Sequence, residues 1–336
     1  MARVGARLHA RGRVTGAASG TRVALQRLDG RTWRTVGSAT VSGGRFTATV
    51  PTSATGLFAY RVATVPRTGA AATSRTFSVA IGRGNPAALG YLTTPPARWN
   101  PCAPIRYRVN LAGAPRGAAT DVDLSIQQVS AATGLRFVKA GATTVIPGSQ
   151  GREVLDDYPR GTELVIAFVT PGKGAKHSAY LPRTSDTVGV GGAFYTDATT
   201  RVRGQSSHQI VQGYLVLDRT KKLPGGFGPG NRHGLLGTWG QVMMHELGHV
   251  VGLDHPRPSD PAQIMYPATT TKPATWGAGD LVALRRVGAV SGCLQTPGFT
   301  GVAANSPAAA GASSRMSHDG IGRDDRVQVR PLDRRH

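Results

Sequence analysis

Hydrophobic and polar residues alternate along the first quarter of the chain, in a pattern typical of short β-strands. In Arg22–Leu28, for example, Val23 and Leu25 share one side of the segment, and the Asp29-Gly30 pair that follows favours a tight turn. Turn residues recur roughly every 8–12 positions, as in β-sandwiches. The pattern therefore predicts a small all-β sandwich over residues 5–82. Its expected strands are Arg22–Leu28, Trp33–Val41, Arg45–Val50, Phe58–Thr64 and Thr76–Ala80.

The pattern changes after a breaker-rich segment, residues 83–97, which predicts a linker. Apolar residues at helical spacing then predict a helix at Ala118–Thr133, ended by Gly134, and the most regular helix of the chain at Leu235–Val251. Helices and strands mix throughout residues 98–295, so the expected fold class is α+β. The other expected elements there are a helix at Gly279–Val287 and strands at Pro104–Asn110, Leu135–Val138, Glu163–Val169, Val188–Tyr195 and Ile210–Asp218.

The charge of the chain is strongly positive and unevenly distributed. Lys and Arg number 40 against 18 Asp and Glu among 336 residues, a formal net charge of +22. Residues 1–90 hold 13 Arg and one acidic residue, Asp29, so the β module is expected to attract anionic wall or matrix polymers. Because no basic stripe is interleaved with aromatic residues, specific nucleic-acid binding is not expected.

Features that bear on the location of the protein are few. No apolar run approaches the ~18–20 residues of a membrane span, so none is expected. The tail, residues 296–336, is rich in Ala, Gly, Ser and charged residues, which predicts disorder. The two cysteines, Cys102 and Cys293, lie far apart; they form either one long-range disulfide, which fits an exported protein, or two unrelated buried thiols. The start, Met1–Thr15, has no apolar core of a secretory signal, so the expectation of a secreted or cell-surface protein does not rest on a visible signal.

The segment from His245 to His255 carries the clearest chemical pattern. Positions i and i+4 share a helix face, so His245 and His249 can point at one metal ion. Glu246 is about 100° further round the helix, where it can reach a water on that ion. Gly252 can take a positive φ, end the helix and turn the chain so that His255 returns as a third nitrogen ligand. Three protein ligands and a water are the open coordination of a catalytic zinc ion.

The longer motif H-E-x-x-H-x-x-G-x-x-H at these positions resembles that of the metzincin zinc metallopeptidases, with every fixed position matched. Further along, Ile264-Met265-Tyr266-Pro267 looks like the Met-turn of that clan, in which Met265 would pack beneath the metal as an apolar floor. Met265, Tyr266 and Pro267 together are typical of the matrixin branch. The resemblance covers about residues 98–293, a segment that the two cysteines span. The preceding strands more weakly resemble bacterial immunoglobulin-like modules.

The resemblance implies a metzincin-like catalytic domain, with a twisted mixed sheet and an active-site helix, that hydrolyses peptide bonds in protein or peptide substrates. One Zn²⁺ would bind His245, His249 and His255, and Glu246 would act as the general base. The run Gly189, Val190, Gly191 and Gly192 is the candidate edge strand for an extended substrate, because glycines permit close backbone approach.

Other readings of the sequence remain open. A second Zn²⁺ or a structural Ca²⁺ lacks support from spacing, since His177, Asp186 and His208 are merely scattered through the relevant region. The competing function is a surface-binding protein, with an inactive metal site and an Arg-rich module that binds anionic polymers. A zinc hydrolase acting on non-peptide amides is a third possibility.

Overall fold

The structure, a computed structural model, describes residues 2–66, 69–149, 156–172, 174, 177–182, 187–231, 236–294 and 316–317. The prediction of a disordered tail at 296–336 therefore falls outside the described residues, apart from the two-residue strand β17 (Met316–Ser317). The chain is mixed α and β, with many strands and few helices. None of the helices among the described residues has both the length and the hydropathy needed to cross a bilayer.

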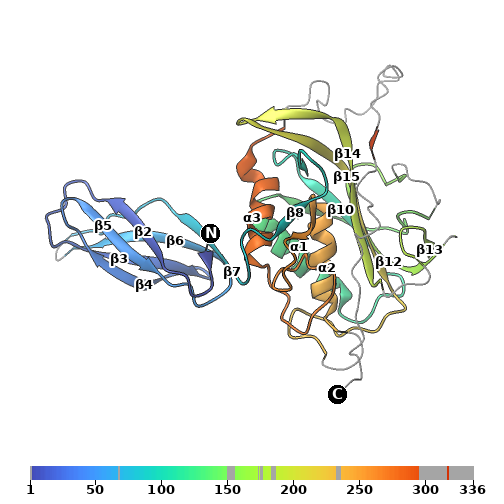
Figure 1. Ribbon diagram of the computed structural model, residues 1–336, viewed down its shortest axis with the longest axis horizontal. Helices are drawn as coiled ribbons and strands as arrows, with labels where there is room; N and C mark the ends of the chain where they lie inside the picture. The colour runs from blue at the N-terminus through green and yellow to red at the C-terminus, as the bar shows by residue number, and fades with distance from the viewer. Residues whose placement is uncertain are drawn as a thin grey trace.

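The N-terminal module consists of two sheets that enclose one small core (Figure 1). The larger sheet has the strand order β1-β7-β6-β3-β4, and β2 pairs with β5 in the smaller one. Alternation places Val23 and Leu25 in the core, together with Ala48 and Val50 from the smaller sheet. The expected sandwich forms, with two strands added before the predicted ones. The strands are β1 (Ala2–Arg3), β2 (Leu8–Arg13), β3 (Arg22–Asp29), β4 (Thr32–Thr40), β5 (Arg45–Val50), β6 (Gly56–Val65) and β7 (Phe77–Gly82).

The second part of the chain is built on a mixed sheet with the order β11-β10-β12-β15-β14-β17. In this order, β11, β10, β12 and β15 are parallel to one another. Strand β14 runs antiparallel to β15. The predicted strands all form, but the last two are longer than expected and make a hairpin of two 14-residue strands. The strands are β10 (Ile105–Asn110), β11 (Phe137–Ala142), β12 (Leu164–Pro171), β13 (His177–Ser178), β14 (Gly189–Val202) and β15 (Gln205–Asp218).

Strand β12 lies in the middle of this sheet and is buried on both faces. Its residues Leu164, Ile166 and Phe168 belong to the main core with the helices, whereas Val165 and Ala167 belong to a smaller core on the opposite face. A continuous apolar run of this kind is typical of a strand covered on both sides. The helices that contribute to the main core are α1 (Ala118–Thr133), α2 (Trp239–Val250) and α3 (Ala278–Val287).

The helix α2 begins later than the hydrophobic pattern predicts. Gly237 has a φ of +87°, and Thr238 is the N-cap, with its side chain accepting a hydrogen bond from the backbone N–H of Gln241 at 3.2 Å. A cap of this kind fixes the start of a helix. The apolar pattern from Leu235 therefore extends beyond the helix itself.

The sequence predicts a linker over residues 83–97. In the structure, parts of this segment are also strands of the second domain. Strand β8 (Leu89–Tyr91) pairs with β16 (Leu253–Arg257), and β9 (Ala97–Arg98) pairs with β15. The sequence did not predict these strands, because isolated strands of two or three residues leave no periodic pattern.

Cys102 and Cys293 form a disulfide, with their Cα atoms 5.5 Å apart. The bridge joins the start and end of the second domain. Around it, Asn100 donates to the carbonyl of Leu294 at 3.0 Å and Arg98 donates to the carbonyl of Gly292 at 2.8 Å. The alternative of two unrelated thiols is therefore wrong.

Candidate metal centre

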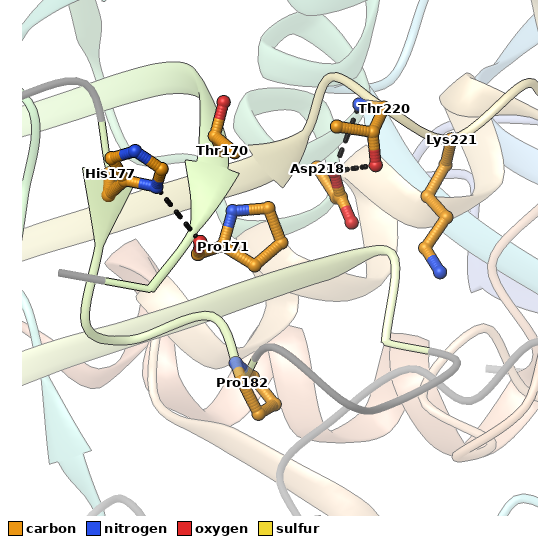
Figure 2. A pocket seen from close by; sticks show the side chains of 7 residues that line it. All are labelled: Thr170, Pro171, His177, Pro182, Asp218, Thr220 and Lys221. Atoms are coloured by element: carbon orange, nitrogen blue, oxygen red, sulfur yellow. Dashed lines mark hydrogen bonds between the residues drawn. The ribbon is translucent and has the colours of Figure 1, made fainter.

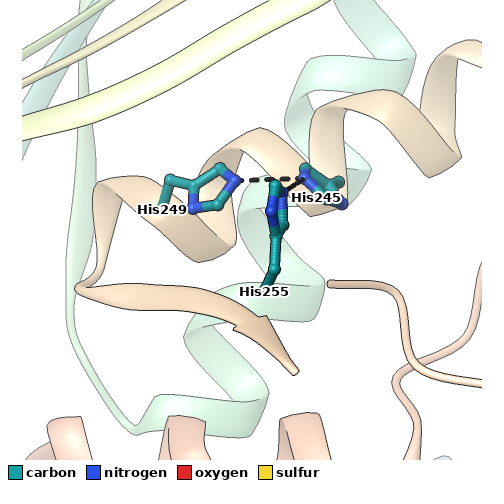
Figure 3. Close-up of side chains that lie close together, drawn as sticks. All are labelled: His245, His249 and His255. Atoms are coloured by element: carbon teal, nitrogen blue, oxygen red, sulfur yellow. Dashed lines mark hydrogen bonds between the residues drawn. The ribbon is translucent and has the colours of Figure 1, made fainter. Parts of the chain in front are cut away.

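Three histidine side chains from two elements meet at one point (Figure 3). Helix α2 carries His245 and His249, and strand β16 carries His255. The Nε2 atom of His245 lies 3.1 Å from that of His249 and 3.3 Å from that of His255. The i, i+4 spacing and the turn at Gly252 thus bring together the three side chains that the sequence predicts.

The other ring nitrogens fix the orientation of the two helical histidines. Nδ1 of His245 lies 2.7 Å from the carbonyl oxygen of Ile264, and Nδ1 of His249 lies 2.8 Å from that of Leu253. Because a carbonyl oxygen only accepts, each Nδ1 must carry the proton, which leaves a lone pair on each Nε2. This is the tautomer that a metal ligand requires.

Burial keeps these imidazoles neutral. Desolvation, followed by repulsion from the neighbouring histidines, holds the pKa of His245 well below its usual value. Burial likewise lowers the pKa of His249 to about 3, with repulsion from His255 as the second cause. Neutral imidazole is the form that binds metal.

The spacing of the ring nitrogens is close to that of metal ligands. Metal–nitrogen bonds of about 2.0–2.1 Å at tetrahedral angles place two ligand nitrogens about 3.3–3.4 Å apart. The separations from His245 to His249 and to His255, 3.1 and 3.3 Å, are close to this value, and the ligand atoms of all three residues lie within 4.8 Å of one another. Three imidazoles are a donor set suited to first-row transition metals. The lone pairs of His245 and His249 converge without a proton between them, which a shared cation would stabilise. These histidines can hold a metal ion.

Glu246 is fully buried beside the triad, between helix α2 and strand β14. Its Oε2 accepts a hydrogen bond of 2.6 Å from the backbone N–H of Gly191. Helix and strand are so close that a Cβ atom at Gly191 would collide with the carbonyl oxygen of Glu246. The carboxylate of Glu246, the residue that follows His245, is therefore held in one place.

Gly252 and Met265 occupy the structural positions predicted for them. Gly252 has a φ of +103°, and its N–H donates to the carbonyl of His249 at 2.9 Å as the helix ends. The Met265 side chain is buried against Gly248, where an added Cβ would collide with the sulfur. Gly248 lies between the two helical histidines, so Met265 packs under the ligand-bearing turn of α2. The next two residues, Tyr266 and Pro267, are half-buried.

Sequence reasoning missed a buried carboxyl group that supports this turn. Asp280, near the start of α3, accepts hydrogen bonds from the backbone N–H groups of Ile264 at 2.6 Å, Met265 at 3.3 Å and Gly277 at 2.9 Å. Burial raises its pKa to about 6. The carbonyl of Ile264 accepts a hydrogen bond from His245. Asp280 holds the N–H of the same residue, so it supports the position of His245 through Ile264. An acidic residue in the first turn of a predicted helix was the available signal.

The glycines of β14 lie close to two neighbours within the domain. Gly189 and Gly191 face α2, and a Cβ at Gly192 would collide with the ring of Tyr214 on the other face. These glycines therefore allow close packing within the domain; substrate approach is not needed to explain them. Among the described residues, β14 pairs on its outer side only with β17, at Tyr195 and Thr196. The stretch with Val190 is thus at the edge of the described sheet.

The scattered candidates for a second metal do not form a cluster with one another among the described residues. His177 and His208 each contact a backbone carbonyl through Nδ1, those of Pro171 and Thr196, and Asp186 lies outside the described residues. Figure 2 shows the pocket beside His177, which shares no residue with the histidine triad. Its buried acid, Asp218, accepts hydrogen bonds from the backbone and hydroxyl of Thr220.

The chain has little detectable similarity to known proteins. No protein-family model matches the chain, and no curated protein is detectably similar to it. One similar solved structure is described as that of a "putative glycoside hydrolase" from Bacteroides vulgatus ATCC 8482, with 11% sequence identity and a TM-score of 0.19. The similarity covers 62% of this chain, which spans only 35% of that chain. A TM-score so low carries no argument about fold or function.

Proposed function

We propose that residues 98–295 form a zinc-dependent endopeptidase of metzincin type. The observation that supports the proposal best is the convergence of three imidazoles, two of them buried and neutral, in the immediate neighbourhood of the buried residue Glu246. Three nitrogen ligands leave a fourth position for water, as catalytic zinc sites do. The match of the Met265 and Gly252 environments to the roles expected of them is further support.

When bound, zinc supplies a Lewis acid that acidifies water and polarises a carbonyl group. Glu246 takes a proton from the attacking water and delivers it to the departing amine. The hydrogen bond from Gly191 leaves this carboxylate little freedom to turn away. The N–H groups of Ile264 and Met265, bound to Asp280, keep the carbonyl that orients His245 in place.

The substrate would bind as an extended chain along the outer edge of β14. This edge runs past α2, which carries Glu246, so a peptide there would have its backbone near the general base. Strand addition supplies affinity through backbone hydrogen bonds and leaves sequence preference to side-chain pockets. Protein and peptide substrates are therefore favoured over small non-peptide amides.

Replacement of the general base tests this function directly. Glu246→Gln keeps the size of the side chain and an oxygen that can accept from Gly191, but removes the base. We expect zinc content to stay at one ion per chain while hydrolysis of casein and of a diverse peptide library disappears. Glu163→Gln, a carboxylate paired with Arg106 outside the triad, is the matched control and should cleave as the wild type does. A zinc-loaded wild type that cleaves no peptide would leave the surface-binding function as the better account.

That second function is favoured by one surface of the module. On the sheet of β2 and β5, the exposed residues Arg11, Arg13 and Arg45 share one side, since Arg13 lies opposite Arg45 in the register. Three guanidinium groups on one small face suit an anionic polymer. We expect Arg11→Gln, Arg13→Gln and Arg45→Gln together to elute earlier from heparin–agarose than the wild type.

The control for this elution removes the same charge from exposed positions of the second domain. A triple Gln variant at Arg116, Arg136 and Arg160 should elute between the wild type and the module variant. Equal elution of the two variants would show that only net charge matters and would exclude a specific face.

A further inference from the structure

The third histidine is held by the segment that joins the N-terminal module to the rest of the second domain in sequence. His255 lies on β16, a strand of five residues that follows the turn at Gly252. Among the described residues, β16 pairs with one strand, β8, which comes from the segment predicted as a linker. The position of His255 therefore depends on a distant segment.

The pairing of β8 with β16 flanks the histidine on both sides. Gly90 is the partner of Asp254, and Leu89 is the partner of Arg257, with a shift of register between them that includes His255. A Cβ atom at Gly90 would collide with the carbonyl oxygen of His255 itself. Other residues could adopt the backbone conformation of Gly90. Glycine is needed here because the backbone of His255 comes too close to leave room for a side chain.

Contacts on the other side of the turn come from the same segment. The N–H of Leu92 donates to the carbonyl of Gly252 at 3.1 Å, and Nε1 of Trp99 donates to the carbonyl of Val250 at 2.9 Å. A Cβ atom at Gly252 would collide with the carbonyl of Ala97. Residues 90–99 thus contact the chain from the end of α2 to the third ligand.

The segment is itself anchored before it reaches β8. The carbonyl of Arg83 accepts from the N–H of Ala278 at 2.7 Å, and the N–H of Asn85 donates to Asp260 at 2.7 Å. Ala88 is fully buried against the start of α3, where a Cβ at Gly279 would collide with its carbonyl. The strand β8 accordingly lies with the helices of the second domain and apart from the module (Figure 1).

From these contacts we infer that the segment 83–99 is a positioning element for the third metal ligand, so that metal affinity is set in part by strand β8. The inference rests on the metal site of the proposed function. The segment supplies none of the three histidines and acts through the backbone of His255. Deformation of this pairing should weaken metal binding more than an equal loss of stability elsewhere.

The substitution Gly90→Ala tests the inference, with zinc affinity measured by chelator competition on the full chain. We expect affinity to fall about tenfold or more, because the new methyl group displaces the backbone of His255. The matched control is Gly148→Ala, which has a φ of +72° and would meet the Tyr180 ring at 2.9 Å on the other face of the sheet. This control should lower the melting temperature and leave zinc affinity unchanged. Equal affinity in Gly90→Ala and the wild type would overturn the inference.

A double variant distinguishes positioning from general loosening. If β8 acts through the third ligand, Gly90→Ala should have no further effect on zinc affinity once His255→Ala is present. A tenfold loss that persists in that background would contradict the inference. If Gly90→Ala does not fold, Trp99→Phe removes the hydrogen bond to Val250, together with part of the buried ring. It should weaken zinc binding threefold or more, again only when His255 is present.

The same measurements separate this inference from the proposed function. A wild type that binds zinc and cleaves nothing would overturn the peptidase and leave the positioning test intact. A wild type that binds no zinc would overturn both.

Discussion

The helix-borne and strand-borne ligands of the metal centre are held in different ways. His245 and His249 share one face of α2 and are fully buried. Their Nδ1 atoms contact the backbone carbonyls of Ile264 and Leu253, respectively. His255 is half-buried on a short strand whose partner, β8, lies far earlier in the chain. The first arrangement follows from local sequence spacing. The second needs a long-range contact, so a motif can be intact while its third ligand is misplaced.

Removal of each type of ligand should show this difference most strongly. His245→Ala and His255→Ala should both lower zinc affinity more than 100-fold, since even residues behind the ligands change affinity by about 10–100-fold. Without metal, however, His245→Ala should cost about 2–4 kcal/mol because it empties a buried site, and His255→Ala less than about 1 kcal/mol. Chelator competition and urea unfolding in EDTA measure the two effects. Equal losses of metal-free stability would contradict the comparison.

The disulfide should stabilise the fold without setting the metal site. Cys102→Ser with Cys293→Ser should lower the free energy of unfolding by about 3–5 kcal/mol, as expected for a bridge that closes so long a loop. Zinc affinity of the folded variant should stay within about threefold of the wild type. A tenfold loss of zinc affinity would mean that the disulfide, and not the pairing with β8, fixes the position of His255.

Met265 supports the helical pair from below. Met265→Ala should cost about 2–4 kcal/mol in unfolding free energy, because it leaves a cavity against Gly248. Met265→Leu, which conserves volume, should cost less than about 1.5 kcal/mol. A similar cost for both variants in urea titrations would argue against tight packing under the ligand-bearing turn.

The pH dependence of the metal-free protein should report the buried imidazole. His249 has a pKa of about 3 when folded and near 6.5 when unfolded, so the unfolded chain binds the proton more readily between these values. Its contribution is fully present above about pH 6.5 and is lost as pH falls, by about 2 kcal/mol between pH 7.5 and 5. Asp280, whose pKa is raised to about 6 in the folded state, has the opposite effect: its contribution to the free energy of unfolding increases as pH falls below about 6.

Urea unfolding in EDTA at several pH values, with His249→Ala beside the wild type, measures this contribution. The variant should lose the rise in stability toward neutral pH that His249 supplies. An unchanged profile would mean that the histidine is accessible to protons when folded.

The sequence predicted those features that depend on neighbouring residues. The helix at Ala118–Thr133 ends at Gly134 as expected, with a φ of +73°, and the spacing within α2 aligns two histidines. It could not predict β8, whose three residues show no periodicity and whose pairing with β16 depends on the whole chain. For the same reason it could not predict that the glycines of β14 lie against α2 and Tyr214.

Anomalous diffraction at the zinc absorption edge, from crystals of the zinc-loaded protein, tests the central claim most directly. We predict one peak at the point where Nε2 of His245, His249 and His255 converge, about 2.0–2.1 Å from each atom. A peak at two of these residues only, or none at this point, would contradict the account.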